Sequence, residues 1–386
     1  RLNVDKPAVQ DIFLRFYPRY LEQYRPSPQQ AKTANNIINC KTGAYGANVS
    51  VCEDCRSIQI HYNSCRNRCC PMCQTLPKEK WIDLRREDVL DAPYFHVVFT
   101  MPEELNPVIY SSQSLLYNAL YHAASDTLEE LSADGKYLGA KIGYLFILHT
   151  WGSEMNYHPH IHAIVLGGGL DGKKQRRDRG EEFFLPVRVI SKVFRGKYME
   201  TMKGLWKDGK LEFHGSAGKY QNRYAFQELM DTCYRKEWAP YCKKTFNGSG
   251  DVISYLGKYT HRIAISNHRL VSMTENTVTF SVKDYRDEGK WKTLTLQGAE
   301  FIRRFLMHVP PKRFVRIRHY GLLSVRTKAK EPALCRNLLG CRKYLSELRG
   351  MKSTEALKHL WGIDVCSCRS CGGRLVASAP KYPLRI

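Results

Sequence analysis

Three histidines stand at alternate positions in the stretch NYHPHIHAIVLGG, residues 156–168. Side chains of a β-strand alternate between its two faces, so His158, His160 and His162 share one face if this run is a strand. Ile161 then points the other way, into a core. Neutral imidazole is a common metal ligand. We therefore predict a metal site at His160 and His162 rather than a row of surface histidines, with His158 as a candidate third ligand.

A pair of tyrosines is the second group of residues that could do chemistry. Tyr255 and Tyr259 in YLGKY are four residues apart, so both phenols share one face of a helix. Packing on a core would explain such a pair by itself. Beside a metal site on a basic chain, however, a tyrosine hydroxyl is a competent nucleophile toward phosphorus. The basic side chains next to this pair, which we expect to contact DNA, are Lys258, His261 and Arg262.

Cysteine pairs form the third group. CEDC (52–55) and CPMC (70–73) are two Cys-x-x-Cys pairs with fourteen residues between them. This is close to the spacing of a four-cysteine zinc ribbon, in which each pair supplies two thiolates to tetrahedral Zn²⁺. We therefore predict a structural zinc site at Cys52, Cys55, Cys70 and Cys73. The same block also contains Cys40, His61, Cys65 and Cys69, which could form a second site. These cysteines could instead stay free, and Cys69 could replace Cys70 in the first site.

A second cysteine block lies near the end of the sequence. CSCRSCGG (366–373) offers Cys366, Cys368 and Cys371 for a C-terminal metal site. Cys335 and Cys341 could complete its ligand set. A single Cys-x-x-Cys pair is weak evidence for a metal site, because cysteines without a metal would explain it too. A C-terminal metal site and free cysteines therefore both stay open.

Charge and cysteine usage restrict the partners. The 386 residues include 60 Lys+Arg against 37 Asp+Glu, a net charge of +23 that favours nucleic acid as partner. The sequence contains no apolar run of about 18 residues, the length that a membrane-spanning helix needs. No signal peptide is visible either, so a cytoplasmic, nucleoid-associated location is expected. Fourteen cysteines, several in Cys-x-x-Cys pairs, indicate zinc rather than disulfides. Later basic stretches add Arg303, Arg304, Arg316 and Arg318 as expected DNA contacts.

The elements that must position these groups are mixed. We predict strands over 94–102, 141–152, 156–168, 277–284 and 290–298, with the second and third forming an antiparallel hairpin. Helices are predicted over 7–25 (ended or kinked at Pro18), 77–92, 113–134, 299–309 and from 250, and mostly helix over 186–246 with a small hairpin at 208–215. Strands and helices without strict alternation predict an α+β fold with an antiparallel sheet.

The combination of His160-Ile161-His162 with Tyr255 and Tyr259 resembles the HUH endonucleases. Their rolling-circle transposase branch, the bacterial insertion sequences of the IS-ninety-one type, is most similar. The resemblance covers nearly the whole chain, including SCRNRCCPMCQ (64–74), FHVVFTMP (95–102), HPHIHAIV (158–165), YLGKYTHRIAISNHRL (255–270) and EFIRRFLMHVPPKRFVRIRHYGLL (300–323). The family usually has His where this chain has Cys69, which suggests that position 69 is a zinc ligand.

The resemblance implies three parts. An N-terminal helix and zinc-binding domain would occupy residues 1–76. An HUH nuclease domain over 77–330 would carry a central antiparallel sheet, with the tyrosine helix laid across its metal face. A helical C-terminal region with a cysteine knuckle would cover 331–386.

The resemblance also implies the activity. Such a transposase cleaves and rejoins single-stranded DNA at transposon ends and target through a 5′-phosphotyrosine intermediate, with Mg²⁺ or Mn²⁺ at His160 and His162 and without ATP. By analogy, Tyr255 is the favoured nucleophile if only one tyrosine acts. His96 and Asp251 are further candidates for a third metal ligand. The alternatives are a plasmid replication initiator or relaxase, and a non-enzymatic zinc DNA-binding protein with structural histidines.

Overall fold

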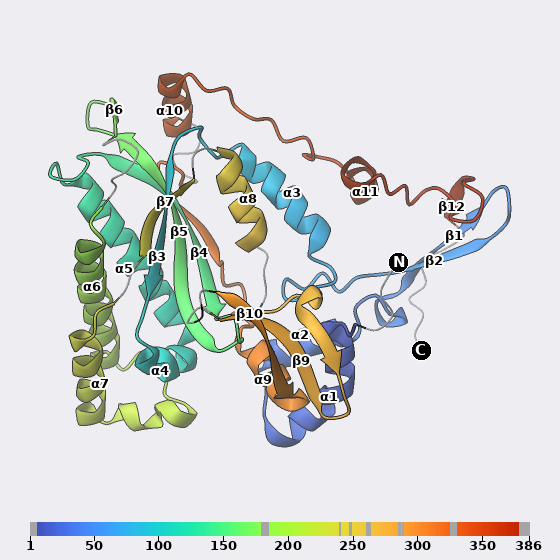
Figure 1. The fold of residues 1–386 in the computed structure, drawn as a ribbon, viewed down its shortest axis with the longest axis horizontal. Helices are drawn as coiled ribbons and strands as arrows, with labels where there is room; N and C mark the ends of the chain where they lie inside the picture. The colour runs from blue at the N-terminus through green and yellow to red at the C-terminus, as the bar shows by residue number, and fades with distance from the viewer. Residues whose placement is uncertain are drawn as a thin grey trace.

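The computed structural model describes residues 6–178, 185–238, 241–246, 249–259, 264–284, 287, 289–324 and 330–377. Within these ranges the chain forms three antiparallel sheets surrounded by helices, which confirms the predicted α+β class (Figure 1). Short 3-10 helices connect several elements: Gly43–Tyr45, Glu103–Leu105, Gly215–Gln221 and Asn267–Arg269.

The largest sheet has six strands in the order β11-β4-β5-β3-β7, with β6 paired to β5. Its strands are β3 (Tyr94–Thr100), β4 (Lys141–Trp151), β5 (Tyr157–Leu170), β6 (Arg176–Arg177), β7 (Tyr241–Phe246) and β11 (Ile317–Gly321). Strand β4 is buried along nearly its whole length, as its continuous apolar sequence requires. The predicted β4–β5 hairpin is confirmed.

Helices cover both faces of this sheet (Figure 1). On one face, Phe99, Phe146 and Ile161 pack in a core with α5 (Gln113–Ala133) and α6 (Val187–Lys207). On the other face, Ile147 and Ile164 pack with residues of α3 (Thr75–Arg86) and α8 (Ser249–Tyr259). Because strand side chains alternate, the face that carries Ile147 and Ile164 also carries the histidines two positions away. The remaining helices beside this sheet are α4 (Asn106–Ser111), α7 (Arg223–Arg235) and α10 (Glu331–Leu339).

A second sheet packs against the N-terminal helices. It contains β8 (Leu270–Met273), β9 (Thr277–Asp284) and β10 (Lys290–Gln297), and shares a core with α1 (Val9–Gln23), α2 (Pro28–Ile38) and α9 (Gly298–Met307). Helix α1 continues through Pro18, where a stop or kink was expected, because Phe16 and Tyr20 are buried on either side of it. This core joins residues that the proposed boundary at residue 76 separates.

The third sheet joins a hairpin near the start of the sequence to the C-terminal end of the described chain. Strand β12 (Leu375–Ala377) pairs with β1 (Ala47–Cys52), which pairs with β2 (Ile58–Tyr62). Figure 1 shows the C-terminal segment running from α10 through α11 (Ser353–Trp361) to β12, beside the β1–β2 hairpin.

Two local predictions were wrong. Residues 208–215 form no hairpin, because the backbone groups of Glu212 and His214 bond to the hydroxyls of Ser112 and Ser111 instead of to each other. Residues 241–246, expected to be helical, form β7, because they pair with the edge of β3.

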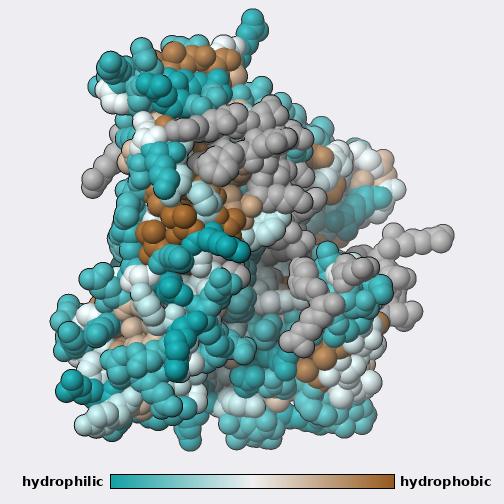
Figure 2. All heavy atoms as spheres, turned by 60° about the vertical axis from the view of Figure 1, so that its left-hand side comes forward, coloured by the Kyte–Doolittle hydropathy of each residue, from teal (hydrophilic) through white to brown (hydrophobic). Residues whose placement is uncertain are grey.

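None of the described helices is long and apolar enough to cross a membrane. Figure 2 shows one face of the molecule, over which hydrophilic side chains predominate.

Candidate active site and zinc centres

Three histidines converge on the α8 face of the central sheet. His149 of β4 is directly opposite His160 of β5, and His162 follows two residues later on the same face. One ring nitrogen from each of the three lies within 4.8 Å of the others. His149 was missed in the sequence, although it lies within the predicted strand 141–152. Only the antiparallel pairing of His149 with His160 points to it, and the pattern within one strand does not show that pairing.

Hydrogen bonding prepares His160 to bind a metal. Its Nδ1 donates to the backbone carbonyl of His158 at 2.6 Å, so the lone pair is on Nε2. That Nε2 lies 3.0 Å from Nε2 of His162. Burial lowers the pKa of His160 to about 4 and holds the pKa of His162 well below its usual range. Both rings are therefore neutral near pH 7, the form that ligates metals, and the residues fit a bound cation.

The other candidate ligands lie elsewhere. His158 contributes its carbonyl to His160, but its ring is outside the three-histidine group, so its expected role as a ligand is corrected. Asp251 is exposed at the first turn of α8 and is also outside this group. His96 lies on β3 next to the group, facing Tyr255.

Tyr255 reaches the histidines from helix α8. Its hydroxyl oxygen lies 2.9 Å from Nε2 of His96 and 2.9 Å from Nδ1 of His162. Those two ring nitrogens are themselves 2.9 Å apart. Burial lowers the pKa of His96 to about 4, so this imidazole is neutral near pH 7 and can accept a proton. A phenol, a neutral imidazole and a histidine of the three-histidine group thus form one hydrogen-bonded triangle.

Packing fixes helix α8 over the sheet. Val252 and Ile253 are buried in the core that also contains Ile82 of α3. Gly257 lies so close to α3 that a Cβ atom there would be 3.1 Å from Cδ1 of Ile82. The backbone of Tyr259 ends α8, one turn beyond Tyr255. The side chains of Tyr259 and Lys258, and all of His261 and Arg262, lie outside the described residues.

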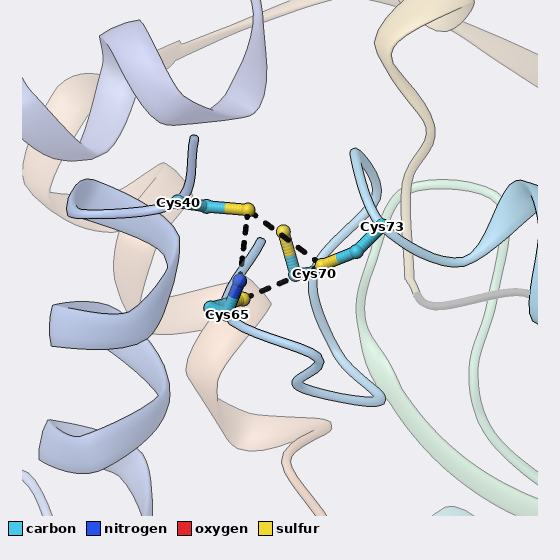
Figure 3. Close-up of side chains that lie close together, drawn as sticks. All are labelled: Cys40, Cys65, Cys70 and Cys73. Carbon is cyan, nitrogen blue, oxygen red and sulfur yellow. Dashed lines mark hydrogen bonds between the residues drawn. The ribbon is translucent and has the colours of Figure 1, made fainter. Parts of the chain in front are cut away.

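The first cysteine group is Cys40, Cys65, Cys70 and Cys73, whose sulfur atoms lie within 4.8 Å of one another (Figure 3). The Sγ atom of Cys73 is 3.4 Å from that of Cys65 and 3.6 Å from that of Cys40. The four side chains point toward a common centre in Figure 3. Four sulfur ligands without an open position are typical of structural zinc.

The expected pairing of Cys52 and Cys55 with Cys70 and Cys73 is therefore wrong. Pairing of Ala47 with Tyr62 brings the chain before β1 next to the chain after β2, so Cys40 and Cys65 meet at the base of the hairpin. Cys52 is at the other end of β1. Cys69 is buried but belongs to neither described sulfur group, so its expected role as a ligand is also corrected.

A second sulfur group contains Cys52, Cys55, Cys368 and Cys371, again within 4.8 Å of one another. Cys366 is exposed and lies outside this group. Cys335 and Cys341, which could have completed a C-terminal site, are outside it as well. The two Cys-x-x-Cys pairs of this group come from opposite ends of the sequence.

The four described arginines expected to bind DNA have partners within the protein. Arg303 and Arg304 both bond to Glu300 on their own helix. Arg318 donates to Asn118 Oδ1 at 2.6 Å and lies over the ring of Tyr121. Arg316 lies 6.0 Å from the ring centre of Trp151. These contacts give the four side chains structural roles, and their contact with DNA stays a prediction.

Comparison with known proteins identifies the family. A profile described as "Transposase zinc-binding domain" matches residues 12–101, and one described as "Putative transposase" matches residues 143–331. A protein of Sinorhizobium fredii named "Putative transposase y4qJ" is 42% identical over 370 residues, covering 95% of this chain and 93% of that protein. The transposase for insertion sequence element IS801 of Pseudomonas savastanoi pv. phaseolicola is 25% identical, covering 99% of this chain and 95% of that protein.

Solved structures add a weaker likeness. The metal-bound complex of the conjugative relaxase TrwC with oriT DNA is 16% identical over 42% of this chain and 69% of that chain, with a TM-score of 0.25. That score is too low to establish a common fold.

The group of Cys40, Cys65, Cys70 and Cys73 lies inside the matched zinc-binding domain, which supports structural zinc there. With close to full-length similarity to y4qJ, the chain belongs to the insertion-sequence transposases of the IS91 type, with an N-terminal zinc-binding domain.

Proposed function

We propose that this transposase cleaves and rejoins single-stranded DNA by an HUH mechanism, with Tyr255 as the nucleophile. The observation that carries the proposal is the position of the Tyr255 hydroxyl, 2.9 Å from both His96 and His162, at the edge of the three-histidine group. A phenol held against a ligand histidine is next to the place where a phosphate would bind.

The cation would be held by His149, His160 and His162. When bound, it would polarise the scissile phosphate and offset the negative charge that develops during attack. Magnesium strongly prefers oxygen ligands, whereas imidazole also suits transition metals. Of the two expected ions, the three-imidazole set therefore favours Mn²⁺ over Mg²⁺.

The protein groups supply the proton path. The Tyr255 hydroxyl donates its proton to Nε2 of His96, and Nδ1–H of His162 donates a hydrogen bond to the phenolate oxygen. The oxygen then attacks phosphorus, an O–P bond to tyrosine forms, and the bond from phosphorus to the 3′ oxygen breaks. The leaving 3′ oxygen takes up the proton that His96 accepted, so the products are a 5′-phosphotyrosine, a strand with a free 3′-OH and a neutral His96.

Strand transfer reverses the same chemistry. A 3′-OH of a transposon end or of the target attacks the phosphotyrosine, and tyrosine leaves with its proton restored. The phosphodiester energy is conserved in the intermediate, so no ATP is needed. Tyr259, one turn further along α8, is proposed as a second nucleophile that alternates with Tyr255 or as a residue that shapes the pocket.

Single-stranded transposon ends and target DNA are the proposed substrates, in keeping with the net charge of +23. Replication initiators and relaxases would use the same chemistry on other DNA. The similarity to transposases along nearly the full chain favours transposition. A non-enzymatic zinc protein does not require a tyrosine hydroxyl hydrogen-bonded to a histidine of the proposed metal site, so the contact of Tyr255 with His162 favours an enzyme.

The test is covalent capture of labelled single-stranded transposon-end oligonucleotides in the presence of Mn²⁺. The wild-type protein should form an adduct that survives denaturing electrophoresis. Tyr255→Phe keeps the ring but removes the attacking oxygen, so it should form no adduct and still bind the oligonucleotide. An undiminished adduct in Tyr255→Phe would overturn the assignment, and an adduct in the Tyr255→Phe/Tyr259→Phe double variant would overturn catalysis by this tyrosine pair.

A further inference from the structure

We propose that Cys52, Cys55, Cys368 and Cys371 bind a second structural zinc, which ties the C-terminal segment to the N-terminal domain. The four sulfur atoms lie within 4.8 Å of one another. Across the two pairs, the Sγ atoms of Cys52 and Cys371 are 3.5 Å apart, and those of Cys55 and Cys368 are 3.6 Å apart. The zinc-binding domain would then be discontinuous, because the matched residues 12–101 supply only half of the ligands.

The backbone around Cys368 and Cys371 has the form of a zinc knuckle. The N–H of Ser370 points at Sγ of Cys368, and the N–H of Gly373 points at Sγ of Cys371, each at 3.4 Å. Backbone donors aimed at sulfur stabilise the thiolate that a metal needs. The first cysteine group has the same feature, since the N–H of Asn67 lies 3.4 Å from Sγ of Cys65.

Glycines permit the tight turn that presents these sulfurs. Gly372 has φ of +79°, which a side chain would strain. At Gly373, a Cβ atom would lie 2.0 Å from Oδ2 of Asp54, in the opposing Cys-x-x-Cys turn. The N–H of Glu53 also bonds to the carbonyl of Arg374 at 3.0 Å. The two turns thus face one another at close range, with the ligands between them.

The sheet that carries the site has too little apolar core to hold itself together. None of the three hydrophobic clusters of the described residues includes a residue of β1, β2 or β12. Ile58 and Ile60 of β2 are 67% and 52% exposed, and Val376 of β12 is 40% exposed. A small sheet of this kind needs a metal or another cross-link for stability. Zinc at the four sulfurs supplies that cross-link.

The zinc would also anchor the chain that lies on helix α3. The hydroxyl of Tyr344 donates to Oδ1 of Asp83 at 2.7 Å, and the N–H of Leu348 donates to Oδ2 of Asp83 at 2.9 Å. Lys80 donates to the carbonyl of Met351 at 2.6 Å. Residues 344–351 therefore form a strap across α3. Cys368 and Cys371 follow this strap in the sequence, after α11, so the zinc would anchor the chain that continues from it. Helix α3 in turn packs on α8, which carries Tyr255.

Zinc content of the purified full chain tests the site. The wild-type protein should contain two zinc ions per chain. Cys368→Ser/Cys371→Ser and Cys52→Ser/Cys55→Ser should each contain one, because each removes half of the same site. Cys366→Ser is the matched control from the same block, and should retain two. One zinc in the wild-type protein, or two in either double variant, would overturn the proposal.

A second measurement does not depend on the folding of any variant. Cadmium-substituted wild-type protein should give two ¹¹³Cd resonances, both in the range of four-sulfur sites, and a single such resonance would contradict the second site. Hydrogen exchange then tests the anchoring of the strap. Amides of residues 344–351 should exchange faster in Cys368→Ser/Cys371→Ser than in Cys366→Ser. Equal exchange would show that the strap is held without the zinc.

Discussion

The hydroxyl oxygen of Tyr255 lies 2.9 Å from Nε2 of His96, and the two residues come from different layers of the fold, helix α8 and strand β3. The contact exists because α8 is packed on the face of the sheet that displays alternate residues of β3, β4 and β5. A neutral imidazole at this distance can take the phenol proton directly, which assigns His96 the role of general base in the proposed reaction.

Replacement of His96 by glutamine should slow cleavage near pH 7 by about 10²–10⁴-fold, the usual contribution of a general base. The defect should shrink as the pH rises, because hydroxide can then remove the phenol proton in place of His96. The affinity for single-stranded DNA should stay unchanged, because the substitution affects the cleavage step and not DNA binding. Cleavage rates of both proteins across this pH range provide the check. A defect of equal size at every pH would point to a merely structural role.

His149→Ala should reduce cleavage as strongly as His160→Ala or His162→Ala, because all three rings would hold the same cation. We expect a loss of about 10²–10³-fold or more in the rate of adduct formation, with oligonucleotide binding retained. His158→Ala is the matched control, since its ring lies outside the three-histidine group and the variant keeps the backbone carbonyl that accepts from His160. Its activity should stay within a few-fold of wild type. Normal cleavage by His149→Ala would remove it from the ligand set.

Cys65→Ser should lose the zinc of the first cysteine group and lower the stability of the N-terminal domain, because the sulfurs of Cys40, Cys70 and Cys73 would lack their fourth partner. Cys69→Ser, a buried neighbour outside the group, should keep the metal. Thermal unfolding and metal content of the two variants provide the comparison. If Cys69→Ser lost the zinc and Cys65→Ser kept it, Cys69 would be a ligand. That result would contradict the assignment of Cys40, Cys65, Cys70 and Cys73 as the zinc ligands.

Asp83→Asn should destabilise the strap on α3 by about 1–3 kcal/mol near pH 7. Burial raises the pKa of Asp83, but hydrogen bonds from Ser346, Tyr344 and Leu348 outweigh it and leave the pKa below its usual value. The stabilisation is therefore present above the unfolded pKa of about 3.9 and is lost as the pH falls through the folded pKa. The difference in unfolding free energy between wild type and Asp83→Asn should narrow accordingly below about pH 5.

Urea unfolding of both proteins at a series of pH values measures this difference. Glu79→Gln on the same helix is the control, because Glu79 pairs with Lys78 near the surface and should change stability little at any pH. A pH-independent difference for Asp83→Asn would show that the carboxylate charge plays no part.

Local patterns in the sequence were enough to predict part of the site. His160 and His162 are two residues apart on one strand, so period-two alternation alone places them together. Tyr255 is in a helix, as its spacing from Tyr259 indicates. The hairpin of β4 and β5 follows from two adjacent apolar runs joined by a short turn.

The rest depends on contacts between distant parts of the chain. His149 joins the three-histidine group through the register of β4 against β5, and a shift of one residue would have turned it to the other face. Cys371 meets Cys52 across 319 positions of sequence, which no spacing rule for Cys-x-x-Cys pairs encodes. The contact of His96 with Tyr255 follows from the packing of α8 on the sheet, in which Val252 and Ile253 are buried.

The most direct test of the central claim is the identity of the residue that becomes covalently joined to DNA. Wild-type protein is incubated with a single-stranded transposon-end oligonucleotide and Mn²⁺, digested with protease and nuclease, and the nucleotide-bearing peptide is sequenced by mass spectrometry. The proposed mechanism predicts a 5′-phosphonucleotide on Tyr255, in a peptide that spans α8. A nucleotide found only on a residue outside α8, or no covalent adduct under conditions in which the strand is cut, would contradict it.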